Sequence, residues 1–266
     1  MRDTAGMTAK IAAIYRHPVK GFTPEPLDAV DLAEGAYFPC DRIYAVEDGP
    51  SGFDPAAPVH ISKQKFTVLA HIAEVAQVRT AYDEATGVLA ASAPGRAPFA
   101  GDLRGEPGRA AFAAWLADFL GEAARGPLKV FEAVAPAHRF MDSRSGFVSI
   151  INLASVRDLE ARLGRRLDPL RFRANFYVEG WDAWAENDWT GRGLRLGEAD
   201  LEVLKPIVRC AATHVDPATG ERDVEVVKGL FDNYGHMFCG VYASVTRGGA
   251  ARIGDAAACL AVAAAA

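Results

Sequence analysis

Short apolar runs broken by Gly, Pro and Asp make up much of the first half of the chain and predict β-strands. The runs are rich in Val, Ile, Tyr and Ala, and turn residues separate them. They lie at Lys10–Tyr15, Leu27–Leu32, Arg42–Val46, Ala73–Thr80 and Gly87–Ala91. Short strands at this spacing are typical of a barrel or a sandwich rather than of strand–helix–strand units.

The pattern changes after the Gly- and Pro-rich stretch Ala93–Gly108, which predicts a surface loop. Apolar residues then recur at three- and four-residue steps from Phe112 to Leu120, and Gly121 follows them. This periodicity predicts an amphipathic helix with a C-terminal glycine. The aromatic side chains of this helix are expected to belong to the core.

The second half again favours strands, with two short helices. Strands are predicted at Leu128–Val134, Phe147–Leu153, Asn175–Val178, Leu201–Ile207 and Gly240–Thr246. One helix is expected from an N-terminal cap at Ser155 to Gly164, and the other at Glu225–Tyr234. The sequence therefore predicts a mostly β, mixed α+β protein, with one plausible domain boundary near Gly121–Pro127.

Composition and charge narrow the function classes. The chain has 266 residues, half of them hydrophobic, and a formal net charge of −5, which argues against a general binder of nucleic acid or anionic membranes. No apolar run approaches the ~20 residues that span a bilayer, and the first residues lack the apolar region of a signal peptide. We therefore expect a cytoplasmic protein with reduced thiols and no membrane span.

The best lead to chemistry is Cys210, which follows Lys205-Pro206-Ile207-Val208-Arg209 and precedes an Asp216-Pro217-x-x-Gly220 turn. A guanidinium beside a thiol favours the thiolate, the form that attacks electrophiles and binds soft metals. The other cysteines, Cys40, Cys239 and Cys259, are expected to be small buried side chains. The four cysteines are far apart and form no CxxC pair, so the sequence predicts no iron–sulfur centre or zinc knuckle.

Two further patterns near Cys210 have alternative interpretations. His214, four residues after Cys210, suggests a Cys/His nucleophile pair. If the strand continues, however, the two residues would be about 13 Å apart, which disfavours such a pair. Trp181, Trp184 and Trp189 crowd one segment, where packing is the main expectation and a roof over a binding site is the alternative. Asp216 is expected to serve the backbone of its turn rather than chemistry.

An ordered set of motifs in the second half resembles a MOSC domain. In order, the set is Phe172-Arg173-x-Asn175, Ala185-Glu186-x-x-Trp189, Gly197, Val208-Arg209-Cys210, Thr213, Asp216-Pro217-x-Thr219-Gly220 and Gly254-Asp255. In the first half, His17-Pro18-Val19-Lys20 followed by Asp41-Arg42 resembles the N-terminal β-barrel domain that accompanies MOSC domains. The resemblance implies an N-terminal barrel-like domain at residues 9–126 packed on a MOSC β-barrel at residues 127–266.

The resemblance also implies a ligand, the molybdenum cofactor in its molybdopterin form, in the cleft between the two domains. Cys210 would be the thiolate ligand of molybdenum and the catalytic residue, and Arg209 would flank the metal. Lys20 and Arg42 would bind the anionic end of the cofactor. Phosphate and pterin contacts are implied for Asn152, Ser155, Arg173 and Asn175. Gly21 departs from the family, which often has Ser after the motif lysine.

Three functions are compatible with this ligand. The leading expectation is an oxidoreductase resembling the amidoxime-reducing component, which removes oxygen from N-hydroxylated or other N-oxygenated small molecules. Since the chain has no cluster motif or flavin fingerprint, its electrons would come from a separate donor protein. The alternatives are a sulfur transferase that carries persulfide on Cys210 and a non-catalytic cofactor carrier. An association with pyridoxal phosphate is implied only at the level of the family.

Overall fold

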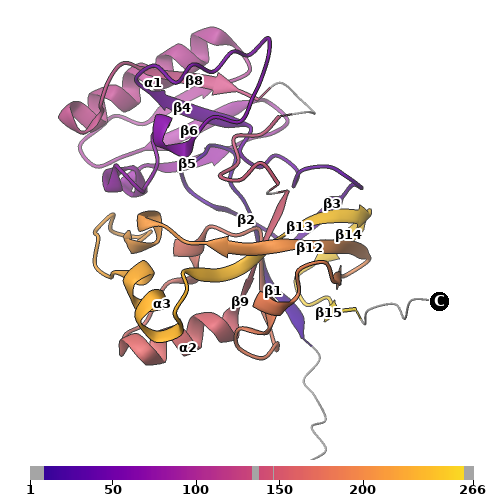
Figure 1. Ribbon diagram of the computed structural model, residues 1–266. Helices are drawn as coiled ribbons and strands as arrows, with labels where there is room; N and C mark the ends of the chain where they lie inside the picture. Colours follow the sequence, from indigo (N-terminus) through magenta and orange to yellow (C-terminus); the bar gives the residue numbers. More distant parts are fainter. Residues whose placement is uncertain (1–8, 134–137, 146, 261–266) are drawn as a thin grey trace, which may run out of the picture.

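The computed structural model describes residues 9–133, 138–145 and 147–260. Figure 1 shows two lobes stacked on one another, one around α1 and the other around α2 and α3. No helix in these residues is long and apolar enough to cross a membrane. The architecture is mostly β with a few helices, as the sequence predicts.

The larger lobe is built on a curled eight-stranded sheet. Its strand order is β15 (Ala257–Cys259), β11 (Gly193–Leu196), β12 (Ala199–Val208), β13 (Phe238–Arg247), β9 (Val148–Asn152), β10 (Phe176–Glu179), β1 (Lys10–Arg16) and β2 (Glu25–Leu27). The β9–β10 pair is parallel and the other pairs are antiparallel. Hydrogen bonds from Ala257 N to Ala9 O (2.8 Å) and from Ile11 N to Asp255 O (2.9 Å) join the segments around β15 and β1. These bonds bring opposite ends of the sheet together, so the sheet curls into a barrel.

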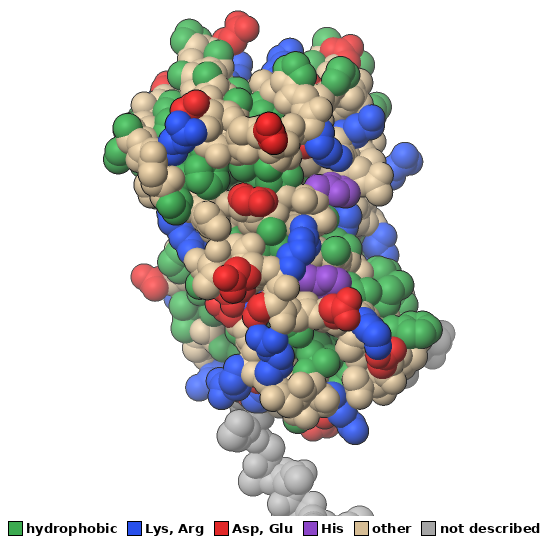
Figure 2. Space-filling model, turned by 90° about the vertical axis from the view of Figure 1, so that its left-hand side faces the viewer, with side chains coloured by type: hydrophobic (Ala, Val, Ile, Leu, Met, Phe, Trp, Pro, Cys, Tyr) green, Lys and Arg blue, Asp and Glu red, His purple; other side chains and the backbone are tan. Residues whose placement is uncertain are grey.

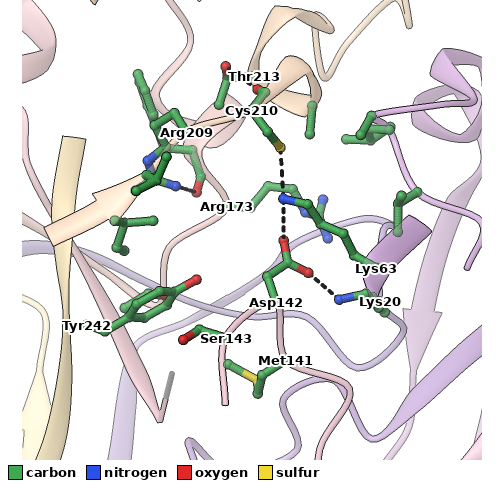
Figure 3. A pocket seen from close by; sticks show the side chains of 18 of the residues that line it. Lys20, Lys63, Met141, Asp142, Ser143, Arg173, Arg209, Cys210, Thr213 and Tyr242 are labelled. Carbon is green, nitrogen blue, oxygen red and sulfur yellow. Dashed lines mark hydrogen bonds and ion pairs between the residues drawn. The ribbon is translucent and has the colours of Figure 1, made fainter. Parts of the chain in front are cut away.

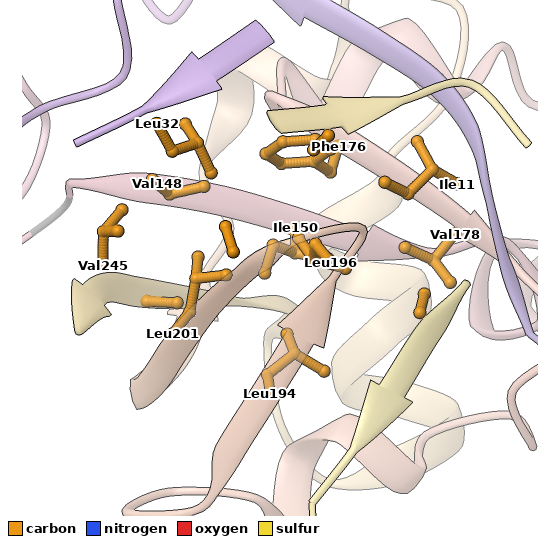
Figure 4. Packing of buried hydrophobic residues seen from close by; sticks show 14 of the residues in the cluster. Ile11, Leu32, Val148, Ile150, Phe176, Val178, Leu194, Leu196, Leu201 and Val245 are labelled. Atoms are coloured by element: carbon orange, nitrogen blue, oxygen red, sulfur yellow. The ribbon is translucent and has the colours of Figure 1, made fainter. Parts of the chain in front are cut away.

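A hydrophobic core fills the inside of this sheet (Figure 4). Alternate residues of β12, such as Leu201 and Val203, are buried because side chains of a strand point to opposite faces. Ile150 and Phe176, from neighbouring strands, are fully buried in the same cluster. Each large aliphatic side chain buried in this way contributes about 1.5–3 kcal/mol to stability.

The helices α2 (Leu153–Leu163) and α3 (Val226–Tyr234) pack on each other beside this sheet. Val156, Leu159 and Leu230 form a second apolar cluster with Ile151 of β9. Asn152 caps α2, since its side chain accepts a hydrogen bond from Ala154 N at 3.0 Å. The prediction that Ser155 caps this helix is wrong, because Ser155 lies inside its first turn.

The smaller lobe combines two small sheets with one helix. The strands β4 (Tyr44–Asp48) and β8 (Leu128–Glu132) form an antiparallel pair. The second sheet contains β5 (Arg79–Tyr82), β6 (Val88–Ser92) and β7 (Phe99–Asp102), and α1 (Glu106–Leu120) packs against β7 and β8. Phe112 and Leu116 of α1 are fully buried, so the aromatic helix belongs to the core as predicted.

Strand pairing crosses position 126, where the sequence prediction divides the chain. The N-terminal strands β1 and β2 belong to the eight-stranded sheet, and β3 (Ala29–Leu32) pairs with β14 (Gly249–Arg252). Conversely, β8 pairs with β4 of the smaller lobe. Residues 10–32 therefore contribute strands to the larger lobe before the chain enters the smaller one.

Several predicted elements differ from the structure. Ala73–Gln77 is a 3₁₀ helix and not a strand. The prediction failed here because the spacing of apolar residues in so short a segment fits either conformation. The strand predicted at Leu27–Leu32 is divided at Asp28 between two sheets. The stretch predicted as a loop at Ala93–Gly108 contains β7 and the start of α1, where Pro107 suits the first helical turn.

The remaining short elements were not predicted. They are the strands β11 and β14 and the 3₁₀ helices η1 (Lys63–Lys65), η3 (Gly121–Ala123), η4 (Pro169–Phe172), η5 (Ala185–Asp188) and η6 (Ala211–His214). Two of these, η1 and η6, position residues of the site described below.

Candidate functional site

A cavity of about 380 Å³ lies where the two lobes meet. It falls within the size range of small-molecule sites. Segments far apart in sequence line it. They are residues 20–21, 42, 63 and 68–70 from the first half and residues 141–143, 149, 171–173, 205–210, 212–213 and 242 from the second half. Figure 3 shows Lys20, Lys63, Asp142, Arg173 and Cys210 directed toward a common space.

The cavity is rich in positive charge although the chain is acidic. The cations that line it are Lys20, Arg42, Lys63, Arg171, Arg173, Lys205 and Arg209, and its lining contains one carboxylate, Asp142. Figure 2 shows basic and acidic side chains interspersed over one outer face of the molecule. The positive charge needed to bind an anionic ligand is therefore local to the cavity.

Cys210 lies at the wall of the cavity, just after β12 ends at Val208. Its carbonyl accepts hydrogen bonds from Thr213 N (3.0 Å) and Thr213 Oγ1 (2.9 Å), which fix the turn into η6. The half-buried thiol accepts a hydrogen bond from Lys63 Nζ at 3.1 Å. An ammonium at this distance stabilises negative charge on sulfur.

Arg209 does not supply the cation at the sulfur, contrary to the sequence argument. Its guanidinium donates to Cys239 O and Phe172 O, both at 2.8 Å, and lies over the Phe172 ring. These bonds tie β12 to the neighbouring segments behind the cavity. Lys63 takes the role at the sulfur that was expected of Arg209.

Lys20 enters the cavity from the short segment that follows β1. Val19 forms a β-bridge with Tyr44, and the Lys20 side chain is only 3% exposed. Its ammonium donates to Phe140 O at 2.9 Å and to the Asp142 carboxylate. Burial lowers the pKa of Lys20 in spite of this carboxylate. The partial desolvation of the half-exposed Asp142 carboxylate is outweighed by the charges of Lys20 and Lys63, which hold its pKa below its ordinary value.

Arg42 and Arg173 meet across the two lobes. Arg42 Nη2 donates to Arg173 O at 2.9 Å, and its other amine group pairs with Asp41. Both arginines have a left-handed backbone, with φ of 51°. Nη2 of Arg173 is buried and has no hydrogen-bond partner among the described residues. Burial, followed by the charge of Arg42, lowers the pKa of Arg173 to about 10.

Lys20, Arg42, Arg173 and Cys210 thus line the same cavity, as the sequence predicts. Arg209 also lines the cavity, whereas the predicted residues Asn152, Ser155 and Asn175 do not. Asn152 Nδ2 and Ser155 Oγ each donate to the buried carboxylate of Glu186 at 2.8 Å. Asn175 Oδ1 accepts a hydrogen bond at 2.8 Å from Oγ of Ser149, which lines the cavity. These three side chains hold segments of the larger lobe together.

The neighbouring candidates also have structural roles. His214 lies in η6, and its Nε2 accepts from Val227 N at 3.3 Å. Asp216 Oδ1 accepts from Ala218 N at 2.8 Å and Thr219 N at 3.1 Å, which supports the predicted turn. None of the three tryptophans is in the lining of the cavity in the described structure. Trp181 and Trp189 pack edge to face, and Trp184 packs on Tyr234.

Sequence reasoning missed Lys63 and Asp142. Lys63 is 147 positions from its partner Cys210, and Asp142 is 122 positions from Lys20. Lys63 belongs to a Ser-Lys-Gln-Lys run and Asp142 to a Met-Asp-Ser-Arg run, which resemble ordinary exposed turns. No local signal marks either residue.

Replacement of Lys63 is expected to slow alkylation of Cys210 about tenfold, because a charge-assisted hydrogen bond contributes roughly 1.5–3 kcal/mol. Lys63→Gln removes the ammonium, whereas Lys65→Gln changes an exposed lysine in the same 3₁₀ turn. The measurement is the rate of iodoacetamide labelling at Cys210, followed by peptide mass spectrometry. Equal rates in the two variants would contradict a specific role for Lys63.

Gly21, in the cavity wall, has a conformation that explains the departure from serine. Its φ is +91°, and a Cβ there would lie 2.7 Å from Thr67 O. We expect Gly21→Ala to lower the free energy of unfolding by about 3 kcal/mol, through backbone strain and a clash. Gly35→Ala is the control, since Gly35 also has positive φ (+67°) but open space around its Cβ position. It should cost only about 1 kcal/mol in denaturant titrations; equal losses would contradict the clash.

The buried His17–Asp41 pair, which positions Arg42, predicts acid sensitivity. Asp41 Oδ1 accepts from His17 N at 2.7 Å and lies 3.2 Å from His17 Nδ1. Burial, with the charge of Arg42, lowers the pKa of His17 from 6.5 to about 3. Between these values the unfolded state binds the additional proton, so stability falls as the pH falls. Between pH 7 and pH 5 His17 should account for a loss of about 2 kcal/mol.

Chemical denaturation of the wild type and His17→Gln at both pH values measures this loss. The decrease in unfolding free energy from pH 7 to pH 5 should be smaller in the variant. An identical decrease would show that His17 does not remain neutral in the folded protein.

Comparisons with known proteins agree with these features. The model of the MOSC N-terminal beta barrel domain matches residues 8–125, and that of the MOSC domain matches residues 137–258. Mitochondrial amidoxime-reducing component 1 of Homo sapiens is 31% identical over 96 residues, which are 36% of this chain and 28% of that protein. Molybdenum cofactor sulfurase of Anopheles gambiae is 35% identical over 108 residues, which are 36% of this chain and 14% of that protein.

The matched part spans less than a third of the length of these two relatives. Among solved structures, the YUAD protein of Bacillus subtilis superposes with a TM-score of 0.44 at 14% identity and 94% coverage of both chains. The two family models together cover most of the chain and confirm the resemblance seen in the sequence. The chain belongs to the MOSC domain family, in the form that carries an N-terminal MOSC β-barrel domain.

Proposed function

We propose that this chain binds the molybdenum cofactor in its molybdopterin form and reduces N-hydroxylated or other N-oxygenated small molecules. The observation that carries the proposal is the convergence of the Cys210 thiol with Lys20, Arg42 and Arg173 on one cavity of about 380 Å³. MOSC domains are associated with this cofactor, and two relatives are named for amidoxime reduction and cofactor sulfuration.

The donor set of the cavity fits the chemistry of this group. A pterin dithiolene with a terminal phosphate needs cations and hydrogen-bond donors at its anionic end and a soft ligand at its metal. Nη2 of Arg173 is a buried donor that has no acceptor among the residues that the structure describes. Lys20 is a buried ammonium that can serve as a point charge for phosphate. The thiol of Cys210 is the soft ligand.

Each residue would have a distinct task when the cofactor is present. Cys210 would hold the metal, and Lys63 would contact its sulfur. Arg173 and Lys20 would bind the phosphate and pterin end, while Arg42 would fix the Arg173 carbonyl and thereby the orientation of that segment. The cofactor would supply the electron and oxygen-atom chemistry, and the protein would place and tune it.

The electron donor is proposed to be a separate protein. The four cysteines of the chain are far apart in sequence and have no cluster spacing. No group of three or more candidate metal ligands from His, Cys, Asp and Glu occurs in the part of the chain that the structure describes. A small-molecule substrate and a protein donor would then both need access to the cavity.

The second candidate function is a sulfur transferase that carries persulfide on Cys210. The Lys63–Cys210 contact favours it, because an anionic sulfur is also the form that attacks a sulfur donor. The relative from Anopheles gambiae, a molybdenum cofactor sulfurase, is consistent with this chemistry. A carrier that protects the cofactor without turnover is the third candidate.

One experiment separates the three functions. Protein from a cofactor-competent host is assayed for reduction of a benzamidoxime with a chemical electron donor, and for uptake of sulfur from a cysteine desulfurase. The proposal predicts turnover that requires molybdenum. A persulfide on Cys210 in pterin-free protein would favour the transferase, and bound cofactor without turnover would favour the carrier.

A further inference from the structure

The positive charges of the cavity are not equally available to a ligand. Arg42 is paired with Asp41, and Arg171 is paired with Asp216 and Asp223. Arg209 is bound to backbone carbonyls. Lys20 and Lys63 instead share Asp142, the one carboxylate in the described lining of the cavity.

Asp142 bridges the two ammonium groups. Its Oδ1 pairs with Lys20 Nζ, and its Oδ2 is 3.6 Å from Lys63 Nζ. In Figure 3 the carboxylate lies between the two lysine side chains. One oxygen for each ammonium is also the arrangement by which a phosphate or another oxyanion would bridge them.

The two sides of this bridge differ in burial. The side chain of Lys20 is 3% exposed, whereas that of Asp142 is 44% exposed. A buried ammonium without a counter-ion destabilises the folded protein. Apart from Asp142, Lys20 Nζ donates only to the neutral acceptor Phe140 O among the described residues. Lys20 therefore requires an anion at this position, and the exposed carboxylate that supplies it can be moved away.

We propose that Asp142 is an internal counter-ion that occupies an oxyanion subsite between Lys20 and Lys63, and that an oxyanionic group of the bound ligand displaces it. Asp142 is then a specificity-determining residue. A ligand must compete with a carboxylate already in place, so a weakly interacting anion such as chloride does not enter, whereas a multivalent oxyanion does. If the proposed function holds, this oxyanion is part of the molybdenum cofactor.

The test uses cofactor-free protein and inorganic phosphate as the probe. Asp142→Asn removes the charge, and Asp142→Glu keeps it. In chloride buffer Asp142→Asn should melt at a lower temperature than the wild type, and phosphate should restore much of the loss. By calorimetry, phosphate should bind Asp142→Asn about tenfold more tightly than the wild type, a difference of about 1.4 kcal/mol.

Two further variants locate the effect. Adding Lys20→Met to Asp142→Asn should abolish the tighter binding. Asp118→Asn changes an exposed aspartate paired with Arg96, outside the cavity lining, and should leave phosphate binding unchanged. Inorganic molybdate is the second probe. If Asp142→Asn gains affinity for phosphate alone, the subsite binds the phosphate of the ligand. If it gains affinity for molybdate and Cys210→Ser abolishes that gain, the subsite binds the oxo-metal end.

Three results would overturn the proposal. The first is phosphate affinity in Asp142→Asn that is no higher than in the wild type. The second is an equal increase in Asp142→Glu, which would show that charge is not the cause. The third is an Asp142→Asn protein that does not fold even in phosphate, because the carboxylate would then be part of the fold and not replaceable. None of these results bears on whether wild-type protein carries molybdopterin, so the two proposals fail separately.

Discussion

Cys210→Ser is expected to abolish turnover and leave the protein folded. A serine hydroxyl is a poor ligand for a soft metal centre, and it cannot carry persulfide sulfur. Cys210 is half-buried at the cavity wall, and its backbone bonds to Thr213 do not involve the thiol, so the substitution should not disturb η6. Activity, molybdenum content and the unfolding transition are measured on the same preparation.

Cys259→Ser is the matched control for this prediction. Cys259 is also a half-buried free cysteine, but it lies in β15, outside the cavity lining, and the variant should retain most of the activity. Near-normal activity with bound cofactor in Cys210→Ser would reject the role of metal ligand.

The second large effect is expected at Arg173. Arg173→Ala should weaken cofactor retention at least tenfold, since each charge-assisted hydrogen bond contributes roughly 1.5–3 kcal/mol. Arg173→Lys should lose less, because it keeps the charge without the forked geometry of a guanidinium. The Arg173 carbonyl remains in both variants, so Arg42 keeps its partner and folding should be little affected.

Molybdopterin content per chain after identical purification measures this effect, together with thermal unfolding of the cofactor-free forms. Arg166→Ala is the control, because Arg166 is 97% exposed and pairs with Glu160 at the surface. Exposed pairs of this kind contribute about 0–1 kcal/mol, so neither content nor stability should change. Unchanged molybdopterin in Arg173→Ala would reject the phosphate contact, and a large loss of stability would identify a structural arginine.

The sequence was informative about the fold where its pattern is strong. The apolar residues of Leu201–Ile207 lie within β12, and the aromatic periodicity from Phe112 to Leu120 lies within α1. Where the prediction failed, the cause is also physical. A Gly-Leu-Arg-Leu segment such as β11 has too few apolar positions to show a period, and its strand is stabilised by pairing with β12 and β15.

The site was predictable only through ordered motifs. Lys20, Arg42, Arg173 and Cys210 come from four separate segments, and the structure brings them to one cavity. Asn152 and Ser155 matched a motif for a strand-to-helix turn, but their side chains bind Glu186. Lys63 and Asp142 acquire their importance from contacts across more than a hundred residues, which no local pattern encodes.

The most direct test of the central claim is the molybdenum and pterin content of the wild-type protein. The protein is expressed in a host that synthesises the cofactor and is purified in parallel with a molybdenum enzyme loaded in the same cells. Metal analysis and pterin fluorescence should give about one molybdenum and one molybdopterin per chain. A folded protein that contains neither, while the reference enzyme is fully loaded, would contradict the assignment of this cavity to the cofactor.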